Sequence, residues 1–127
     1  SDVYKRQEQL FINLISNSLK YSKDDVNPII SIFEEEIFEN EIYESKIISN
    51  QEYCKIVIVD NGIGFKQEYS SKIFNLFYRL EKDSKYSGTG LGLAICKRIV
   101  ENHDGFIQVS SVPGEGAEFA IFIPRNI

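Results

Sequence analysis

The chain has 127 residues, 43% of them hydrophobic and 26% charged, with a formal net charge of -5 at pH 7. This length fits one soluble domain, and no apolar run is long enough to span a membrane. The negative charge disfavours non-specific binding to nucleic acid or anionic lipid, which need a basic surface, so we expect no nucleic-acid partner and no direct membrane contact.

The chain opens with a polar, abrupt segment, SDVYKRQ, which indicates a start within a larger protein. We give residues 1–7 no functional weight, because vector or library sequence is an alternative source. From about Glu8 to Tyr21, apolar residues recur at three- and four-residue steps, which predicts an amphipathic helix ended by Asn27-Pro28. Its expected apolar face comprises Leu10, Phe11, Leu14, Ile15 and Leu19.

Two strands are predicted next. Residues from Ile29 to about Ile37 alternate, with Ile30 and Ile32 on one face, and lead into an acidic hairpin or loop whose boundaries are open. Lys55 to Val59 is continuous and β-branched, which is typical of a central strand covered on both faces. Cys54, beside this strand, lacks metal-ligand spacing and is interpreted as a reduced core thiol.

The second half begins with helical spacing from Glu68 to Leu80, followed by a flexible loop over residues 81–89. Gly90 to Asn102 is predicted as the last helix and contains Cys96, the second core thiol. Asp104-Gly105 then turns the chain into a terminal hairpin, in which FIQVSSV and AEFAIFI flank a PGEG turn.

Helices and hairpin-connected strands in this order predict an α/β two-layer sandwich, with a mixed, mostly antiparallel sheet covered on one face by about three helices. A parallel doubly wound sheet fits less well, because hairpins replace helical crossovers. We expect a single domain over residues 1–127.

A polar stripe on the first helix carries possible chemistry. Its members lie at positions i, i+4, i+7 and i+8, namely Asn13, Asn17, Lys20 and Tyr21. Carboxamide oxygens can join the ligand shell of Mg²⁺, and a lysine one turn away can reach a phosphate. A solvated helix face is the alternative.

Asp60 ends the buried strand and precedes Asn61-Gly62-Ile63-Gly64. A carboxylate there can accept the exocyclic amine of adenine, and glycines let the backbone approach a flat ring; a plain hairpin turn is the alternative. Glycines 88, 90 and 92 precede a helix, where free amides favour phosphate, although a ligand-free hinge remains open.

Three cationic side chains are also candidate site residues. Arg79, Lys82 and Lys85 lie before the glycine-rich segment and could clamp phosphates, with a surface position as the alternative for each. His103 is interpreted as a partner of the last helix's C-terminus rather than as a catalytic group.

In combination, these segments resemble the catalytic ATP-binding domain of sensor histidine kinases, in the Bergerat-fold superfamily shared with gyrase and MutL. The resemblance runs from Gln9 to Pro124. QLFINLISNSLKYS resembles the asparagine box, VIVDNGIGF the first glycine box, KIFNLFYRL the phenylalanine box and GTGLGLAICKRIVENHDG the second glycine box. The segments FYRL and YSGTGLGLAICKRIVENH are similar to those of phytochrome-like and hybrid sensor kinases.

The resemblance implies roles for individual residues. Asn17 would coordinate Mg²⁺ with Asn13 close by, Lys20 and Arg79 would contact phosphate, and Asp60 would read adenine. Phe74 and Phe77 would anchor a lid over ATP. The implied nucleotide-binding set is Asn17, Lys20, Tyr21, Asp60, Gly62, Ile63, Gly64, Phe77, Gly88, Thr89, Gly90, Leu91, Gly92 and Leu93, and the implied catalytic set is Asn13, Asn17, Lys20 and Arg79.

Asn13 departs from the hydrolytic members of the superfamily, which carry a glutamate there. A carboxamide cannot act as a general base, so the chain is expected to transfer the γ-phosphoryl group to a histidine on a separate dimerisation domain. The alternatives are an ATP hydrolase of the same fold and a regulatory docking module that binds no nucleotide.

The resemblance also implies elements outside these residues. We expect the acceptor-histidine dimerisation domain, and the strand that usually precedes the first helix, to be absent from this chain. A response regulator is the expected downstream partner. The expected location of this domain is cytoplasmic. Membrane anchoring of the parent protein is compatible with that location.

Overall fold

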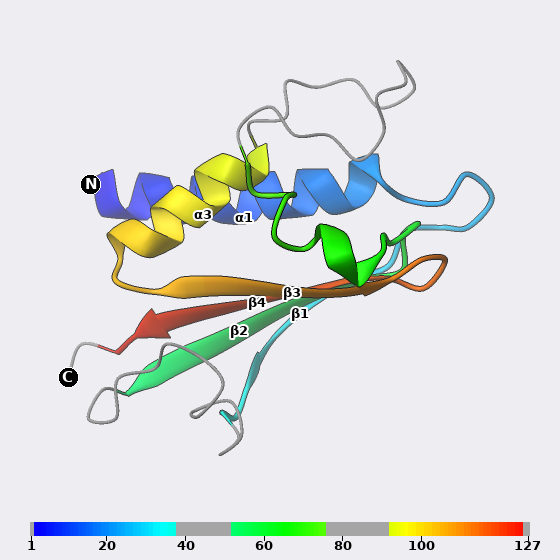
Figure 1. Cartoon of the computed structure of the whole chain (residues 1–127). Helices are drawn as coiled ribbons and strands as arrows, with labels where there is room; N and C mark the ends of the chain where they lie inside the picture. The colour runs from blue at the N-terminus through cyan, green and yellow to red at the C-terminus, as the bar shows by residue number, and fades with distance from the viewer. Residues whose placement is uncertain (1, 38–51, 76–91, 126–127) are drawn as a thin grey trace.

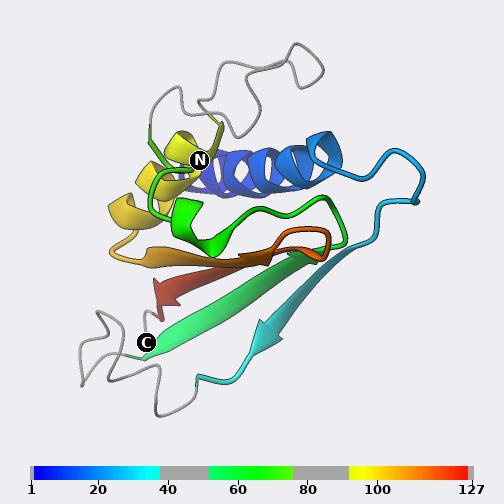
Figure 2. The same ribbon diagram turned by 45° about the vertical axis from the view of Figure 1, so that its right-hand side comes forward.

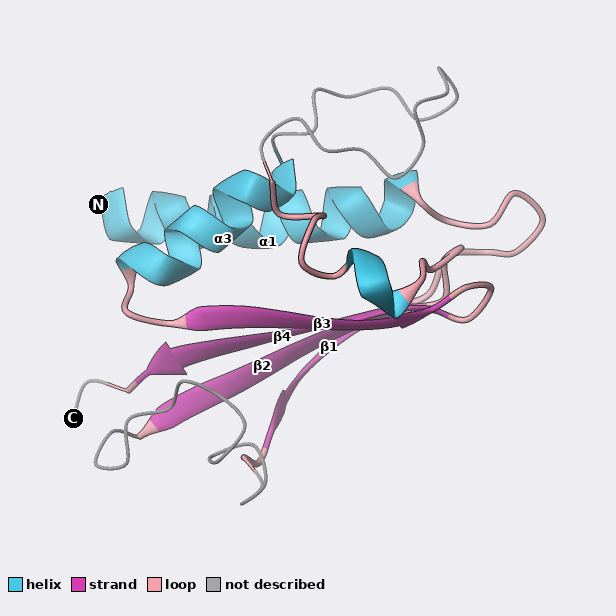
Figure 3. Cartoon of the chain, in the orientation of Figure 1, coloured by secondary structure: helices cyan, strands magenta, loops and turns pink. Residues whose placement is uncertain are grey.

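A computed structural model describes residues 2–37, 52–75 and 92–125. The four strands form one antiparallel sheet in the order β1-β2-β4-β3. The helices α1 and α3 lie side by side over one face of this sheet (Figure 1, Figure 3). The two-layer sandwich is therefore confirmed. In chain order the elements are α1 (Asp2–Lys20), β1 (Ile30–Glu35), β2 (Tyr53–Asp60), the 3₁₀ turn η1 (Gln67–Tyr69), α3 (Gly92–Asn102), β3 (Phe106–Val112) and β4 (Gly116–Pro124).

Helix α1 begins at Asp2, earlier than the apolar spacing predicts, and ends at Lys20. Its buried face follows an i, i+4, i+8 path through Leu10, Leu14 and Ser18. The prediction that Leu19 belongs to this face is wrong, since its side chain is 49% exposed. The reason is geometric. Ser18 lies eight residues after Leu10, a little over two helical turns, so Ser18 and not Leu19 is the next position that faces the sheet.

The sheet has two differently covered faces. Val57 and Ile58 are neighbours on β2 and point to opposite faces, yet both are 0% exposed, which confirms a strand covered on both sides. Ile58 joins the core beneath the helices. On the far face the rings of Phe106 and Phe122 stack at 4.5 Å, and Lys55 Nζ lies 5.6 Å from the Phe122 ring centre.

Strand β1 is the edge of the sheet on one side. It pairs antiparallel with β2, as the sequence predicts, and Figure 2 shows it splayed away from the helix layer. Ile32 is 47% exposed although the pattern places it on the same face as Ile30, because the helices do not extend over this edge. Residues 38–51, in the expected acidic hairpin or loop, lie outside the described residues.

The helix predicted from Glu68 to Leu80 differs where the structure describes it. Residues 67–69 form a 3₁₀ turn, 70–75 continue as turns, and 76–80 lie outside the described part, so the described chain has two α-helices rather than three. Ile73 and Phe74 are still buried, and Phe74 meets Phe119 edge to face at 6.3 Å. Apolar spacing requires these side chains to reach the core, and successive turns achieve this as well as a helix does.

Helix α3 ends in a tight turn. The ring nitrogen Nδ1 of His103 lies 2.8 Å from the Ile99 carbonyl oxygen, which confirms a partner role at the helix C-terminus. Asp104 carries the left-handed backbone, with φ 61°, and the Gly105 amide donates to the Val100 carbonyl at 3.0 Å. Among the described residues, neither helix is long and apolar enough to cross a membrane.

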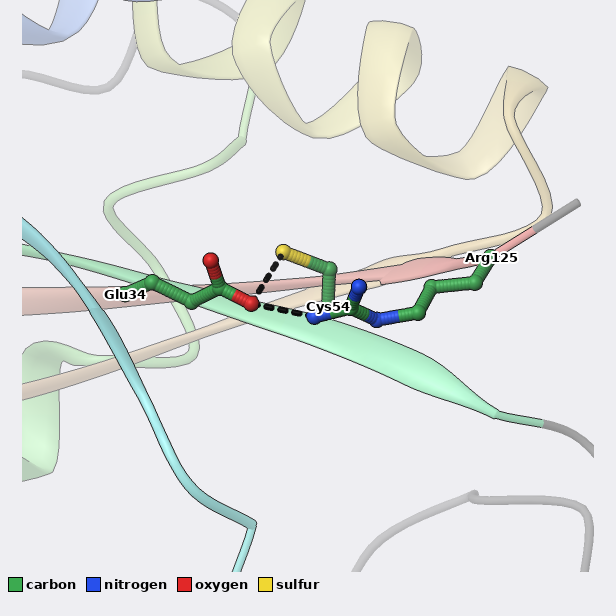
Figure 4. Close-up of polar contacts among 3 residues, drawn as sticks. All are labelled: Glu34, Cys54 and Arg125. Atoms are coloured by element: carbon green, nitrogen blue, oxygen red, sulfur yellow. Dashed lines mark hydrogen bonds and ion pairs between the residues drawn. The ribbon is translucent and has the colours of Figure 1, made fainter.

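Both cysteines are free thiols, but they differ in environment. Cys96 is buried, donates to the Leu10 carbonyl at 3.7 Å, and has its pKa raised by burial to about 12. Cys54 is half-buried, so its assignment to the core is corrected. It lies near the sheet edge, where its Sγ is 3.5 Å from the Glu34 carboxylate that also pairs with Arg125 (Figure 4). Burial, and then Glu34, raise the pKa of this thiol, while Arg125 opposes the shift.

Candidate functional site

The Asp60 carboxylate lies at the end of β2 and is held by three donors. Its Oδ1 accepts from the amides of Gly62 at 2.9 Å and Ala117 at 3.1 Å. Its Oδ2 accepts from the Ser18 hydroxyl at 2.9 Å. These donors come from the turn, from β4 and from α1, so the carboxylate is fixed at the point where three elements meet.

The turn after Asp60 packs directly on the end of α1. The Ile63 amide donates to the Tyr21 carbonyl oxygen at 2.9 Å. A Cβ on Gly62 would lie 2.5 Å from the same oxygen, a distance that real Cβ atoms do not show. Gly62 therefore has a packing reason within the protein itself: the turn and the helix approach too closely for a side chain.

The other side of the turn is fixed by the β3–β4 hairpin. Gly64 has φ 65°, and a Cβ there would lie 2.3 Å from the Val112 carbonyl oxygen. The Gly114 amide donates to the Ile63 carbonyl at 2.7 Å. Residues 62–64 are thus held between α1 and the hairpin, beside Asp60.

Two further side chains join the segment after the turn to β3 and the start of β4. The buried Ser111 hydroxyl accepts from the Phe65 amide at 2.9 Å and donates to the Gly116 carbonyl at 2.7 Å. The Gln67 carboxamide donates to the Val109 carbonyl and accepts from the Ser111 amide, both at 2.9 Å. Gln67 thereby occupies the hydrogen-bonding groups that an additional strand would pair with on the β3 edge.

The Asn61 side chain forms hydrogen bonds with the backbone of the loop between α1 and β1. Its Oδ1 accepts from the Ile29 amide at 2.8 Å, and its Nδ2 donates to the Asn27 carbonyl at 3.1 Å. The connection from α1 to β1 is therefore tied to the turn that contains the predicted site residues.

The polar stripe of α1 flanks Ser18 on the same turns of the helix. Asn13, Asn17, Lys20 and Tyr21 are all half-buried, and Lys20 Nζ lies 5.5 Å from the Tyr21 ring centre. The structure thus joins the C-terminal end of α1 to Asp60 and its turn through the Ser18 hydroxyl and the Tyr21 carbonyl oxygen.

The third predicted element is described in part. Gly92 begins α3 with open space around its α-carbon, and Leu93 packs against the core. Phe74 is buried immediately before the undescribed segment. The remaining predicted site residues lie outside the described part of the chain: Phe77, Arg79, Lys82, Lys85, Gly88, Thr89, Gly90 and Leu91.

Reasoning from sequence missed four side chains that build the site: Ser18, Asn61, Gln67 and Ser111. Ser18 had a usable signal, because it continues the buried i, i+4 path of Leu10 and Leu14 with a hydroxyl. A buried hydroxyl requires a polar partner. Gln67 carried no such signal, because its partners Val109 and Ser111 are 42 and 44 residues away in sequence.

The described residues also line a depression at the opposite end of β2. It is bordered by Glu34, Glu35, Glu36, Ile37, Tyr53 and Arg125. It is separated from Asp60 by the length of the strand and contains none of the predicted site residues. No group of three or more acidic, histidine or cysteine side chains within the described ranges could hold a metal ion.

Comparison with known proteins gives a consistent result. Residues 2–127 match the family described as histidine kinase-, DNA gyrase B-, and HSP90-like ATPase. The phytochrome-like protein Cph1 of Synechocystis is 38% identical over 116 residues, which cover 91% of this chain and 14% of the relative. The sensor protein kinase WalK of Staphylococcus aureus is 40% identical over 124 residues, which cover 96% of this chain and 27% of the relative.

Solved structures agree on the fold. The catalytic domain of histidine kinase ThkA matches with a TM-score of 0.67 and 27% identity, covering 94% of this chain and 67% of that one. The mycobacterial sensor histidine kinase MprB matches with a TM-score of 0.72 and 22% identity, covering 94% and 70%. Full-length ShkA in complex with AMPPNP matches with a TM-score of 0.68 and 22% identity, covering 96% and 22%.

Proposed function

The chain belongs to the family of histidine kinase-, DNA gyrase B- and HSP90-like ATPases, and from this we propose that it is the ATP-binding catalytic domain of a sensor histidine kinase. In its parent protein it would transfer the γ-phosphoryl group of ATP to a histidine on a dimerisation domain. A response regulator would receive the group downstream. The chain spans 14% and 27% of two curated relatives, so the activity of the whole protein is part of this proposal.

The observation that carries the proposal is the meeting of Asp60 with the polar end of α1. The carboxylate, held by Gly62, Ala117 and Ser18, accepts hydrogen bonds from all three. It therefore suits the exocyclic amine of adenine and opposes the carbonyl that guanine carries at the same position.

The phosphate end of ATP would lie along the α1 stripe. Asn17 would supply a carboxamide oxygen to Mg²⁺, with Asn13 close by and Lys20 against a phosphate, while Mg²⁺ itself would neutralise phosphate charge. Asn13 and Asn17 are half-buried and lie one turn apart on the same helix face. This placement suits a Mg²⁺ ion that takes its other ligands from phosphates and water. Tyr21, Ile63 and Gly64 would border the nucleotide, and Gly88, Gly90, Gly92 and Arg79 would cover its phosphates.

Asn13 favours transfer over hydrolysis. At this position a glutamate would be needed to activate water, whereas a carboxamide has no basic group to take the proton. Transfer to an imidazole requires no such base: the bond between the γ-phosphorus and the bridging oxygen breaks, an N–P bond forms, and ADP leaves.

Phosphotransfer can be tested directly. The chain is mixed with an acceptor-histidine domain, γ-labelled ATP and Mg²⁺, and the label on the acceptor is tested for lability in acid and stability in base. We expect acceptor labelling that is lost with Asn17→Ala. Bound ATP without any labelled acceptor would refute the proposal, and steady phosphate release without an acceptor would favour the hydrolase.

A further inference from the structure

We propose that Ser18 is a positioning residue, which orients Asp60 so that a single lone pair of its Oδ2 atom faces the adenine amine. The inference rests on the proposed function and goes beyond it, because it assigns a role to a residue outside the predicted set.

A carboxylate offers about four acceptor directions, two on each oxygen. Both directions on Oδ1 are used, by the Gly62 and Ala117 amides at 2.9 and 3.1 Å. One direction on Oδ2 is used by the Ser18 hydroxyl at 2.9 Å. Within the described residues no fourth donor reaches the carboxylate, so one acceptor direction on Oδ2 is available to a ligand.

The donors differ in what they fix. Rotation of a carboxylate about the bond to its β-carbon is intrinsically soft, so the two amides on Oδ1 restrain it but leave a range of small rotations. Ser18 lies on a different element and binds the other oxygen, so it adds a third restraint on this rotation. The available direction on Oδ2 is therefore held most narrowly when both oxygens are bound.

Ser18 is itself held firmly enough for this role. Ser18 is 2% exposed and continues the buried path of Leu10 and Leu14 on α1. The same helix is joined to the turn by the Ile63 amide and the Tyr21 carbonyl oxygen at 2.9 Å. Movement of the Ser18 backbone relative to Asp60 would therefore require α1 to separate from the turn.

The role predicts an effect that depends on the amine of the ligand. With Ser18→Ala, Oδ2 loses one restraint on its orientation, and the amine of adenine would meet a carboxylate that must be ordered further on binding. We expect ATP affinity to fall by about fivefold to tenfold, which is the cost of ordering one side chain on binding. Purine riboside triphosphate, which lacks the exocyclic amine, should lose almost nothing.

The experiment is a calorimetric titration of four pairs: the original chain and Ser18→Ala, each with ATP and with purine riboside triphosphate. The ratio of the two affinities should decrease in Ser18→Ala and stay unchanged in the control Ser110→Ala, an exposed hydroxyl on β3. Ser18→Cys, which preserves volume and a weaker donor, should give an intermediate ratio even if Ser18→Ala folds poorly.

Equal losses for both ligands in Ser18→Ala and Ser18→Cys would overturn the inference, because Ser18 would then support only the fold. Failure of the proposed function is distinguishable, since the original chain would then bind neither ligand or would not distinguish them. Circular dichroism melting of each variant without nucleotide separates loss of fold from loss of orientation.

Discussion

The Tyr21 carbonyl oxygen accepts a hydrogen bond from the Ile63 amide at 2.9 Å, and this contact joins the end of α1 to the turn after β2. It holds together two segments that are 42 positions apart in the chain, and both contribute to the proposed nucleotide site. The consequences can be tested through the residues that surround it.

Gly62→Ala should disrupt this junction. Its new methyl group would lie 2.5 Å from the Tyr21 carbonyl oxygen, so the turn and α1 must move apart. We expect a loss of roughly 1 to 3 kcal/mol in the free energy of unfolding, measured in urea. Gly92→Ala is the matched control, because its methyl group meets open space at the start of α3 and its effect on stability should be small or favourable. Equal stability of both variants would contradict the close packing.

Asp60→Asn should weaken ATP binding by about 1 to 3 kcal/mol, because a neutral carboxamide replaces the charged acceptor and its NH₂ group competes with the Gly62, Ala117 or Ser18 donors. Calorimetric titration with ATP, at a temperature where melting curves show both proteins folded, measures the effect. Unchanged affinity in the folded variant would refute adenine recognition by Asp60.

Gln67→Met should expose the hydrogen-bonding edge of β3. Methionine has a similar volume but replaces neither the hydrogen bond to the Val109 carbonyl nor the one from the Ser111 amide. We expect a loss of about 1 to 2 kcal/mol in the free energy of unfolding. Gln108 is an exposed glutamine on β3, so Gln108→Met is the control for the change in side-chain chemistry alone. If the two substitutions cost the same, the pairing of Gln67 with β3 contributes nothing.

Cys96 should make stability depend on alkaline pH. Burial raises its pKa from 9.0 to about 12, so the unfolded chain releases this proton first as the pH rises. The contribution of the neutral thiol is therefore complete below pH 9 and is lost as the pH rises through about 12, by up to about 1.4 kcal/mol per pH unit. Urea unfolding of the original chain and of Cys96→Ala across this range measures it. The curve for Cys96→Ala should fall less steeply, and parallel curves would contradict the assignment.

Glu34→Gln should accelerate modification of Cys54. Glu34 raises the pKa of this half-buried thiol through a hydrogen bond and through its charge, whereas Arg125 lowers it. Removing the negative charge leaves Arg125 beside the thiol and increases the thiolate fraction at a given pH. In a Cys96→Ala background, the rate with a disulfide reagent should rise for Glu34→Gln and fall for Arg125→Gln. Unchanged rates in both would show that burial alone controls the thiol.

The sequence alone determined the strand order along the chain, the first and last helices, the terminal hairpin, the burial of β2 and the residue types around Asp60, because periodicity and turn composition are local properties. It erred where a local pattern has more than one three-dimensional solution. The spacing of Ile73 and Phe74 fits a helix, yet residues 67–75 reach the same core as a 3₁₀ turn and further turns. Leu19 matched the apolar spacing, but the position facing the sheet is Ser18.

The tertiary structure decided which donors meet the Asp60 carboxylate. Ser18, Gly62 and Ala117 lie 42, 2 and 57 positions from it along the chain, so no local pattern could connect all three. It also decided that the two glycines of the turn make room for the protein's own backbone, at Tyr21 and Val112. Hydrogen bonds between distant segments are set by how helix, turn and hairpin pack together, and this packing depends on the whole core rather than on any single stretch of sequence.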